Sequence, residues 1–227
     1  ADVADGDQLA VALNQLRQTL PPLGGVVHAA GVLDDGLLLQ LTPERVRRVL
    51  AAKVAGAWNL HTLTQADPLD SFILFSSASG LLGAPGQANY GAANAFLDAL
   101  AYHRRAQRRP ALSINWGPWA GVGLAAAQAI RGQRLATRGV ASLSTEAGLR
   151  ALGRALAQDR PQVGVLSFDL RQWQRYYPQA AGLSFLSELA PARADQPSEP
   201  DVRGRLLALP PGRQRRLLLE TLLVERM

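Results

Sequence analysis

The sequence predicts an α/β protein with a doubly wound parallel sheet. Three observations lead to this prediction. Short apolar runs of strand length alternate along the chain with longer segments of helical periodicity. These runs lack the polar alternation of half-exposed strands, so helices should cover both faces of the sheet. Apolar residues make up 48% of the 227 residues, which is enough for a sizeable core.

Four runs are expected to be buried strands, because each is short and rich in valine, isoleucine, leucine or phenylalanine. Parallel strands end at one edge of their sheet, and ligands bind at the carboxyl ends. The residues that close these runs are therefore the first candidates for a functional site. The runs are GGVVHAA (24–30), SFILFSS (71–77), ALSINW (111–116) and VGVLSF (163–168).

Helical patterns separate the predicted strands. The first ends at Pro21-Pro22, and the second begins with Thr42 as N-cap and Pro43 in its first turn. The glycines of GLLGAPG (80–86) do not have the spacing of a dinucleotide phosphate loop, so this segment is expected to be an ordinary loop. The predicted helices span 6–20, 42–64, 87–108 and 145–159.

The C-terminal part changes in composition. Residues 190–202, APARADQPSEPDV, are rich in proline, alanine and acidic residues and are expected to form a linker. The segment 203–227 then predicts a short helix, a Pro-Pro break and an amphipathic helix. The sequence shows no internal repeat.

The composition excludes several kinds of functional site and disfavours several kinds of partner. The chain has no cysteine, which excludes disulfides, thiolate metal sites and cysteine nucleophiles, and we predict no metal site. No run has the length of a membrane helix and no signal segment opens the chain, so we expect a cytoplasmic protein without a membrane partner. The net charge of +6 leaves a nucleic-acid binder as an alternative. We favour no nucleic acid, because the densest arginine cluster, 103–109, closes a helix where cations are favoured.

Lys53 is the only lysine among the 24 basic residues. It lies inside the apolar helical pattern LAAKVAGAWNL (50–60). Lysine is a compact charge whose pKa responds to its surroundings, whereas arginine is a wide fork that is always charged. A site that needs the compact charge would explain the exception, and chance survival of one lysine is the alternative.

Three further residues form a pattern. Ser77 ends the second predicted strand, and Tyr90 follows 13 residues later. Asn94 lies one helical turn beyond Tyr90, so the two residues share a helix face. Ser77 and Tyr90 can therefore converge on one small oxygen atom at the carboxyl edge of the sheet.

The spacing of Ser77 and Tyr90 resembles that of the short-chain dehydrogenases. Most members carry lysine four residues after the tyrosine and asparagine on the preceding helix, whereas Asn94 and Lys53 exchange these places. This exchange resembles the ketoreductase domains of modular type I polyketide synthases. The resemblance covers roughly residues 1–188 and is densest in HAAGVLDDG, LFSSASGLLGAPGQANYGAANAFLDALA and INWGPWAGVGL.

The resemblance implies a Rossmann-like fold of the short-chain dehydrogenase type that lacks its N-terminal βαβ part. Residues 1–189 would be the C-terminal, catalytic part of the ketoreductase, and 190–202 the linker. The segment 203–227 resembles the first helix of an acyl carrier domain without its phosphopantetheine serine. The chain is thus expected to start after a phosphate loop and to end inside the next domain of a megasynthase.

The resemblance also implies roles for the four residues. Tyr90 would protonate the ketone oxygen, and Ser77 would polarise the same carbonyl. Lys53 would hold the nicotinamide ribose and stabilise the tyrosine anion, while Asn94 orders the lysine and a water. The hydride would come from NADPH, because no side chain can supply one.

The resemblance also implies some of the contacts to the cofactor. By resemblance, Asp2 and Val3 lie beside the adenine, and the turn His28-Ala29-Ala30-Gly31 lies beneath the cofactor. His28 is equally well explained as a buried histidine of the core. Lys53 and Tyr90 would contact the ribose, and Pro118 and Trp119 the carboxamide.

Other positions resemble the B-type ketoreductases, whose product is a D-β-hydroxyacyl thioester. Leu33-Asp34-Asp35 matches their LDD motif, and Pro85 and Asn89 match two further positions. Leu82 stands where the A-type carries tryptophan. The implied role of the loop is to guide the pantetheine arm, and an ordinary acidic turn is the alternative.

The resemblance therefore implies the NADPH-dependent reduction of a carrier-bound β-ketoacyl thioester to a D-β-hydroxyacyl thioester. The partners would be the acyl carrier domain that bears the substrate on phosphopantetheine and the other domains of the same megasynthase. Two alternatives remain, a catalytically silent scaffold segment and a free-standing short-chain dehydrogenase. A silent segment would be expected to have lost one of the four residues, and all four are present.

Overall fold

The structure is a computed structural model that describes residues 1–123, 134–180, 184–189, 209, 212 and 214–216. The chain divides into two compact units, Ala1–Pro178 and Gln179–Met227. The expected linker, 190–202, lies outside the described residues, as does most of the expected carrier segment, 203–227. No described helix is long and apolar enough to cross a membrane.

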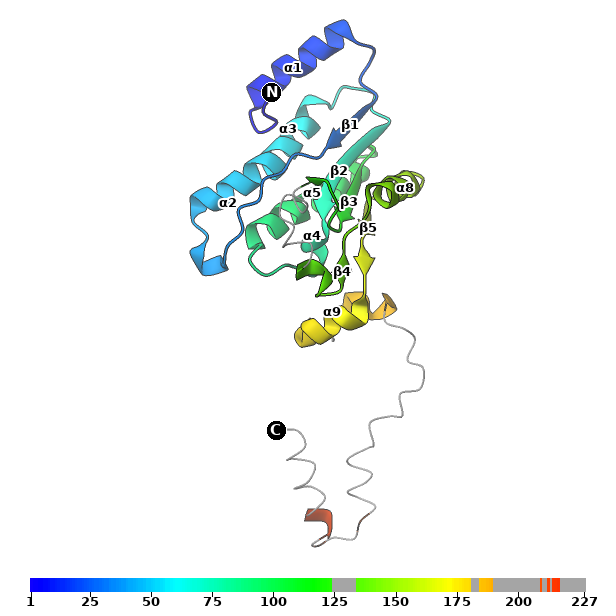
Figure 1. The fold of residues 1–227 in the computed structure, drawn as a ribbon. Coiled ribbons are helices and arrows are strands. Elements are labelled where there is room, and N and C mark those ends of the chain that lie inside the picture. Colours follow the sequence, from blue (N-terminus) through cyan, green and yellow to red (C-terminus); the bar gives the residue numbers. More distant parts are fainter. Residues whose placement is uncertain (124–133, 181–183, 190–208, 210–211, 213, 217–227) are drawn as a thin grey trace. The chain divides into compact units, whose positions relative to one another are not determined.

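A four-stranded parallel sheet forms the centre of the first unit, which confirms the predicted fold class (Figure 1). Its strands follow one another in the order β1-β2-β3-β5. Because all four run in the same direction, their carboxyl ends lie at one edge. The strands are β1 (Gly25–His28), β2 (Ser71–Ser77), β3 (Leu112–Trp116) and β5 (Gln162–Val165).

Side chains that alternate along β2 divide the core into two layers. Phe72 and Leu74 belong to a cluster with residues of three helices, α1, α3 and α5. Ile73 and Phe75 pack in a second cluster that includes Ala155 of helix α8. Both faces of the sheet are therefore covered, as the uniformly apolar strands predicted. These helices are α1 (Gly6–Thr19), α3 (Gly56–Leu63), α5 (Ala88–Ala106) and α8 (Thr145–Leu156).

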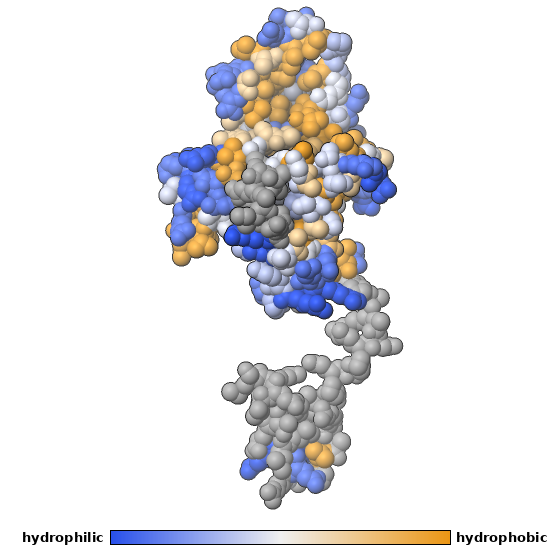
Figure 2. Space-filling model, in the orientation of Figure 1, coloured by the Kyte–Doolittle hydropathy of each residue, from blue (hydrophilic) through white to orange (hydrophobic). Residues whose placement is uncertain are grey.

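Edge strand β1 is covered less completely. Val26 is buried in the first cluster, whereas Val27, on the opposite face of the strand, is 59% exposed. Figure 2 shows apolar surface around α1 and β1 on the side that faces the viewer.

Side-chain caps fix where several helices begin. Asp5 accepts hydrogen bonds from the first turn of α1, and Thr42 does the same for α2 (Pro43–Leu50), as its sequence predicted. Ser144 caps α8, and Asp169 caps α9 (Leu170–Tyr176), a helix that the sequence did not predict. Short 3₁₀ turns lie at Leu38–Gln40, Pro178–Ala180 and Ser184–Leu189.

The predicted helix 42–64 contains a turn of π-helix. α2 passes into a π segment at Ala51–Ala55, and α3 continues from Gly56. Such turns shift the following side chains around the helix axis and are frequent at functional sites. Here the π segment contains Lys53.

Two predictions of local structure were wrong. The segment 80–86 is not wholly a loop, because α4 (Ala78–Leu82) begins directly after β2, with Ser77 accepting a hydrogen bond from the Ser79 amide. The run 163–168 is not one strand. Its second part forms β6 (Ser167–Phe168), which pairs antiparallel with β4 (Val140–Ala141) outside the main sheet.

Two glycines of α8, Gly148 and Gly153, provide a test of the packing in the second core layer. An added Cβ at Gly148 would overlap the Trp119 ring, at 2.6 Å from Cζ3 and 2.8 Å from Cζ2. We expect Gly148→Ala to destabilise the protein by about 1–3 kcal/mol in urea unfolding, because the core must shift. Gly153→Ala in the same helix is the matched control. No neighbouring atom lies within 4 Å of its added Cβ, so it should stabilise the helix by up to about 1 kcal/mol. Equal effects of the two variants would contradict this packing.

Candidate active site

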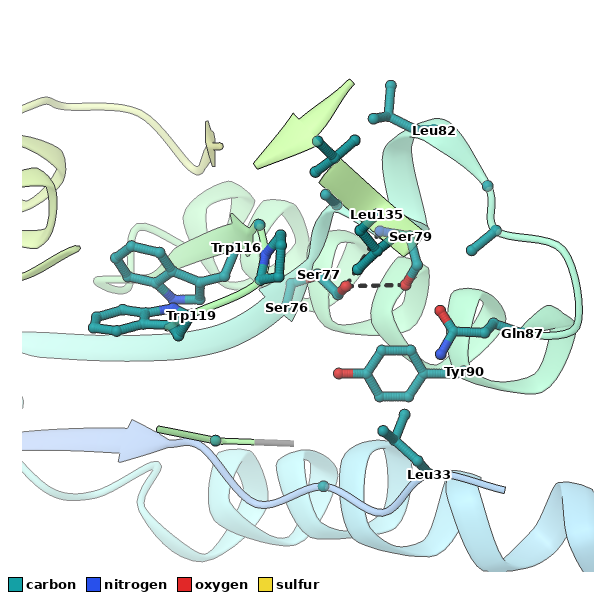
Figure 3. Close-up of a pocket in the computed structure, with 18 of the residues that line it drawn as sticks. Leu33, Ser76, Ser77, Ser79, Leu82, Gln87, Tyr90, Trp116, Trp119 and Leu135 are labelled. Atoms are coloured by element: carbon teal, nitrogen blue, oxygen red, sulfur yellow. Dashed lines mark hydrogen bonds between the residues drawn. The ribbon is translucent and has the colours of Figure 1, made fainter. Parts of the chain in front are cut away.

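A cavity of about 430 Å³ opens at the carboxyl edge of the sheet. This volume lies within the range of small-molecule sites. Its lining comes from the turn after β1, the ends of β2 and β3, the π turn and the start of α5, so the sheet gathers segments that are distant in sequence (Figure 3). Among the lining residues are Ala29, Gly31, Lys53, Ser77, Tyr90 and Trp119.

The π turn places Lys53 inside the molecule. Its side chain is 3% exposed, and its Nζ atom donates a hydrogen bond to the Phe75 carbonyl at 2.8 Å. The same Nζ atom lies 5.5 Å from the centroid of the Tyr90 ring. The helix packs closely just after the π turn, since an added Cβ at Gly56 would meet Val3 at 2.7 Å.

Burial changes the acid–base behaviour of Lys53. Loss of hydration lowers the pKa of the ammonium to about 8, and attraction to the Asp98 carboxylate opposes this shift. Lys53 is therefore mainly protonated at neutral pH and loses its proton just above it. Its charge also contributes to the low pKa of His28, about 4, for which burial of the ring is the larger cause.

Helix α5 presents Tyr90 to the cavity and holds Asn94 behind it. Asn94 is fully buried, and its Nδ2 donates to the Tyr90 carbonyl at 2.7 Å. Its Oδ1 atom is buried and accepts no hydrogen bond from the described residues. An acceptor buried in this way has the capacity to take a hydrogen bond from a lysine or a water. Asn94 does not itself line the cavity.

Ser77 lies where β2 ends and α4 begins. Its Oγ accepts hydrogen bonds from the Ser79 amide at 3.2 Å and from the Ser79 hydroxyl at 3.0 Å. The hydrogen of the Ser77 hydroxyl is therefore left to donate to a ligand. Figure 3 shows the side chains of Ser77 and Tyr90 extending into the same space, from β2 and α5. A carbonyl oxygen in this space could meet both hydroxyl groups.

Part of the cavity wall is a loop that is held by ion pairs. Asp34 pairs with Arg45 at 2.7 Å and with Arg48 at 2.8 Å, both from helix α2. Arg45 also donates to the backbone carbonyl of Asp35 at 2.5 Å. The acidic pair is thus fixed from one side by a helix rather than being a simple solvated turn.

The same loop is tied to the segment before Tyr90. The Asn89 Nδ2 atom donates to the Asp34 carbonyl at 2.9 Å, and its Oδ1 accepts from the Tyr90 amide at 2.8 Å. Gln87 donates to the Asp35 carboxylate at 3.1 Å. The predicted stereocontrol residues therefore divide into two groups. Leu33, Leu82 and Pro85 line the cavity, whereas Asp34, Asp35 and Asn89 hold its wall.

The expected cofactor residues are only partly brought together. Of those positions, Ala29, Gly31, Lys53, Tyr90, Pro118 and Trp119 line the cavity, and Asp2, Val3, His28 and Ala30 do not. Val3 packs beside Gly56, and the Asp2 carboxylate accepts a hydrogen bond from the Ala4 amide. His28 is buried behind the strand end and has no partner for its Nε2 atom among the described residues.

Sequence reasoning missed several residues of the cavity. Trp116 could have been found, because it ends a predicted strand. Gln87 lies one turn before Tyr90, which is a weaker signal. The far wall comes from segments after β3 whose sequence showed no functional pattern, and it includes Leu135, Arg138, Val140, Trp173 and Tyr177.

The chain is similar in sequence to known proteins. A family model described as the KR domain matches residues 1–121. The spectinabilin polyketide synthase system protein NorB of Streptomyces orinoci is 47% identical over 204 residues, which cover 86% of this chain and 9% of NorB. The chain therefore spans less than a tenth of the length of this relative.

Solved structures show the same likeness. The PlmKR1 ketoreductase, from the first module of phoslactomycin biosynthesis in Streptomyces sp. HK803, superposes with a TM-score of 0.74 at 38% identity. The match covers 79% of this chain and 41% of that one. A structure described as A-type ketoreductases from a modular polyketide synthase gives a TM-score of 0.72 at 38% identity, covering 78% of this chain and 37% of that one.

The pKa of His28 is open to direct measurement. We expect its ring to titrate near pH 4 by NMR, because burial and Lys53 both disfavour the charged form. Unfolded histidine binds a proton near pH 6.5, so the protein should lose stability as pH falls from about 6.5 towards 4. Lys53→Met should raise the His28 pKa only in part, since burial remains. A His28 midpoint at or above 6.5 would contradict the buried, neutral ring.

Proposed function

Because this chain belongs to the KR domain family, the ketoreductase domains of modular polyketide synthases, we propose that it reduces a carrier-bound β-ketoacyl thioester to a D-β-hydroxyacyl thioester with NADPH. One observation supports this proposal above the others. Lys53, Ser77 and Tyr90 line one cavity at the carboxyl edge of the sheet. The same observation disfavours a silent scaffold, in which such an arrangement would have no use.

The hydroxyl groups would act on the ketone oxygen. Ser77 donates a hydrogen bond to this oxygen and polarises the carbonyl, since its own oxygen already accepts from Ser79. Tyr90 donates its proton to the same oxygen as negative charge develops there. NADPH, when bound, supplies the hydride to the carbonyl carbon.

Lys53 and Asn94 would serve the proton donor. The ammonium of Lys53, 5.5 Å from the Tyr90 ring, stabilises the phenolate that remains after proton transfer. A lysine pKa of about 8 keeps this charge at neutral pH and allows Lys53 to pass on a proton. The buried Asn94 Oδ1 offers an acceptor for the lysine or for a water on the path that reprotonates Tyr90.

The residues present fit a nicotinamide cofactor. Ala29 and Gly31 leave room at the end of β1, and Lys53 offers a cation beside it. Pro118 and Trp119 also line the cavity, where a nicotinamide ring could stack against the indole. The preference for NADPH over NADH follows from the family resemblance, and so do the expected contacts of Asp2, Val3, His28 and Ala30.

The chain's place in a larger assembly is also a proposal. Relatives such as NorB are much longer than this chain. We propose that residues 1–189 form the C-terminal, catalytic part of the ketoreductase, 190–202 a linker and 203–227 the start of an acyl carrier domain. The partners would be the carrier that bears the phosphopantetheine thioester and other domains of the same synthase. The cytoplasmic location stays a prediction.

The B-type assignment rests on the cavity wall. Leu33, Leu82 and Pro85 border the site, and Leu82 leaves space where an A-type domain carries tryptophan. The ion pairs of Asp34 hold this wall in one position, which a guide for the pantetheine arm requires. Likeness in fold to an A-type structure at 38% identity does not decide the handedness of the product.

Tyr90→Phe tests the proposed acid. In the full-length protein, we expect the reduction of a β-ketoacyl thioester to fall by about 10²–10⁴-fold, the usual contribution of a general acid. Ser77→Ala should cost less, because Tyr90 still donates. Tyr102→Phe is the matched control, since this tyrosine lies on the same helix, is 53% exposed and should keep normal activity. Normal turnover by Tyr90→Phe would show that Tyr90 is not the acid.

Handedness gives a separate test. Chiral chromatography of the product from a pantetheine-bearing substrate should show the D-hydroxyl. Substrates without the pantetheine arm should be reduced less selectively, because each lost guiding contact is worth only about 1 kcal/mol. A predominantly L product would overturn the B-type assignment and leave the roles of Tyr90, Ser77 and Lys53 intact.

A further inference from the structure

A buried carboxylate lies behind the candidate active site. Asp98 is one helical turn beyond Asn94 on α5, and the residue is 7% exposed. Its carboxylate accepts hydrogen bonds from the Ser113 hydroxyl at 2.6 Å and from Asn115 Nδ2 at 2.8 Å, both on β3. Helix α4 passes close to it at Gly80, where an added Cβ would lie 3.4 Å from the carboxylate. Asp98 does not line the cavity.

Hydrogen bonds connect this carboxylate to the site. The Asn115 amide that donates to Asp98 also lies 3.0 Å from Ser76 Oγ and 3.2 Å from the Ser77 carbonyl. Ser76 in turn donates to the Asn94 carbonyl at 3.2 Å. The network therefore joins Asp98 to the strand end that carries Ser77 and to the helix that carries Tyr90.

Asp98 also complements a buried charge. Lys53 forms no ion pair among the described residues, and its hydrogen bond goes to the neutral Phe75 carbonyl. An isolated buried ammonium is costly. Beside Lys53 lie His28 of β1, which is neutral above about pH 4, and Tyr90 of α5. Asp98 is reached through the hydrogen-bond network, because Lys53 bonds the Phe75 carbonyl and the next residue, Ser76, is joined by Asn115 to the Asp98 carboxylate. Of these, Asp98 is the one whose attraction favours the protonated lysine.

We propose that Asp98 is a positioning residue of this site, whose carboxylate, fixed by Ser113 and Asn115, keeps the Lys53 ammonium charged beside Tyr90. It acts through Lys53 and does not touch substrate or cofactor. Its effect on catalysis rests on the proposed ketoreductase function, whereas its effect on Lys53 does not. Asparagine cannot replace it, because a neutral amide supplies no countercharge.

The test follows Lys53 itself by NMR in the full-length protein without substrate. Lysine labelled with ¹³C reports protonation through its Cε–Hε resonance, and Lys53→Met identifies the signal. In the unchanged protein the midpoint should lie near pH 8. In Asp98→Asn it should move to lower pH, because the attraction that favours the charged form is lost.

Two controls separate charge from structure. Asp159→Asn removes a carboxylate at an exposed ion pair with Arg105 and should leave the Lys53 midpoint unchanged. Ser113→Ala removes a hydrogen bond from Asp98 but keeps its charge, so it should lower stability and shift the midpoint less than Asp98→Asn does. An unchanged midpoint in folded Asp98→Asn would overturn the proposal. If Asp98→Asn alone does not fold, adding Lys53→Met should restore folding by removing the uncompensated cation, and failure to do so would also overturn it.

Enzyme kinetics provide a second test of the role of Asp98. The rate of thioester reduction in Asp98→Asn should begin to fall at a lower pH than in the unchanged protein, following the Lys53 midpoint. A purely structural defect would lower the rate at every pH without changing the pH at which the rate begins to fall. That result would count against the proposal. A moved NMR midpoint in a protein that reduces no ketothioester would instead leave the role of Asp98 intact and refute the proposed function.

Discussion

The burial of one ammonium group governs the arrangement of this site. Lys53 is almost fully removed from water and contacts no carboxylate among the described residues, so the surrounding chain must compensate for lost hydration. The Phe75 carbonyl, the Tyr90 ring and the more distant Asp98 each supply part of that compensation. The π turn is the backbone feature that contains the lysine at this place. Arginine would need more space and more partners than this pocket provides.

Polar groups elsewhere in the site also serve two purposes. Ser77 ends a strand, caps a short helix and points a hydroxyl into the cavity. Asn89 holds the Asp34 carbonyl with one end of its amide and the Tyr90 backbone with the other. Such sharing fixes the polar side chains of the cavity without large added structure. It also means that a substitution at Asn89 disturbs both the wall and the Tyr90 backbone.

Much of the fold could be predicted because its signals are local. Uniformly apolar strands and capped helices follow from neighbouring residues, and the four parallel strands are present in the structure. The spacing of Ser77 and Tyr90 likewise indicated a shared site, because strand ends of a parallel sheet meet at one edge.

The rest depends on contacts that the sequence does not mark. Nothing in AAKVA distinguishes a π turn from an α-helix, and Arg45 looks like any exposed helical arginine until its ion pair with Asp34 is seen. Asp98 resembles a polar residue on a helix surface, yet the fold buries it against β3. The far wall of the cavity includes Leu135, Arg138, Val140, Trp173 and Tyr177, which tertiary packing brings to the site.

The clamp on the acidic loop has a consequence for protein engineering. Arg45 reaches the Asp34 carboxylate and the carbonyls of Asp35 and Gln40, while an added Cβ at Gly36 would collide with its guanidinium at 2.8 Å. The position of the tripeptide Leu33-Asp34-Asp35 therefore depends on Arg45 of α2 and on the space that Gly36 leaves for it. Grafting these three residues alone into another domain would not transfer the contacts that hold them in place. A transplant of this part of the cavity wall would need to carry the tripeptide together with Gly36, Arg45 and the opposing Gln87.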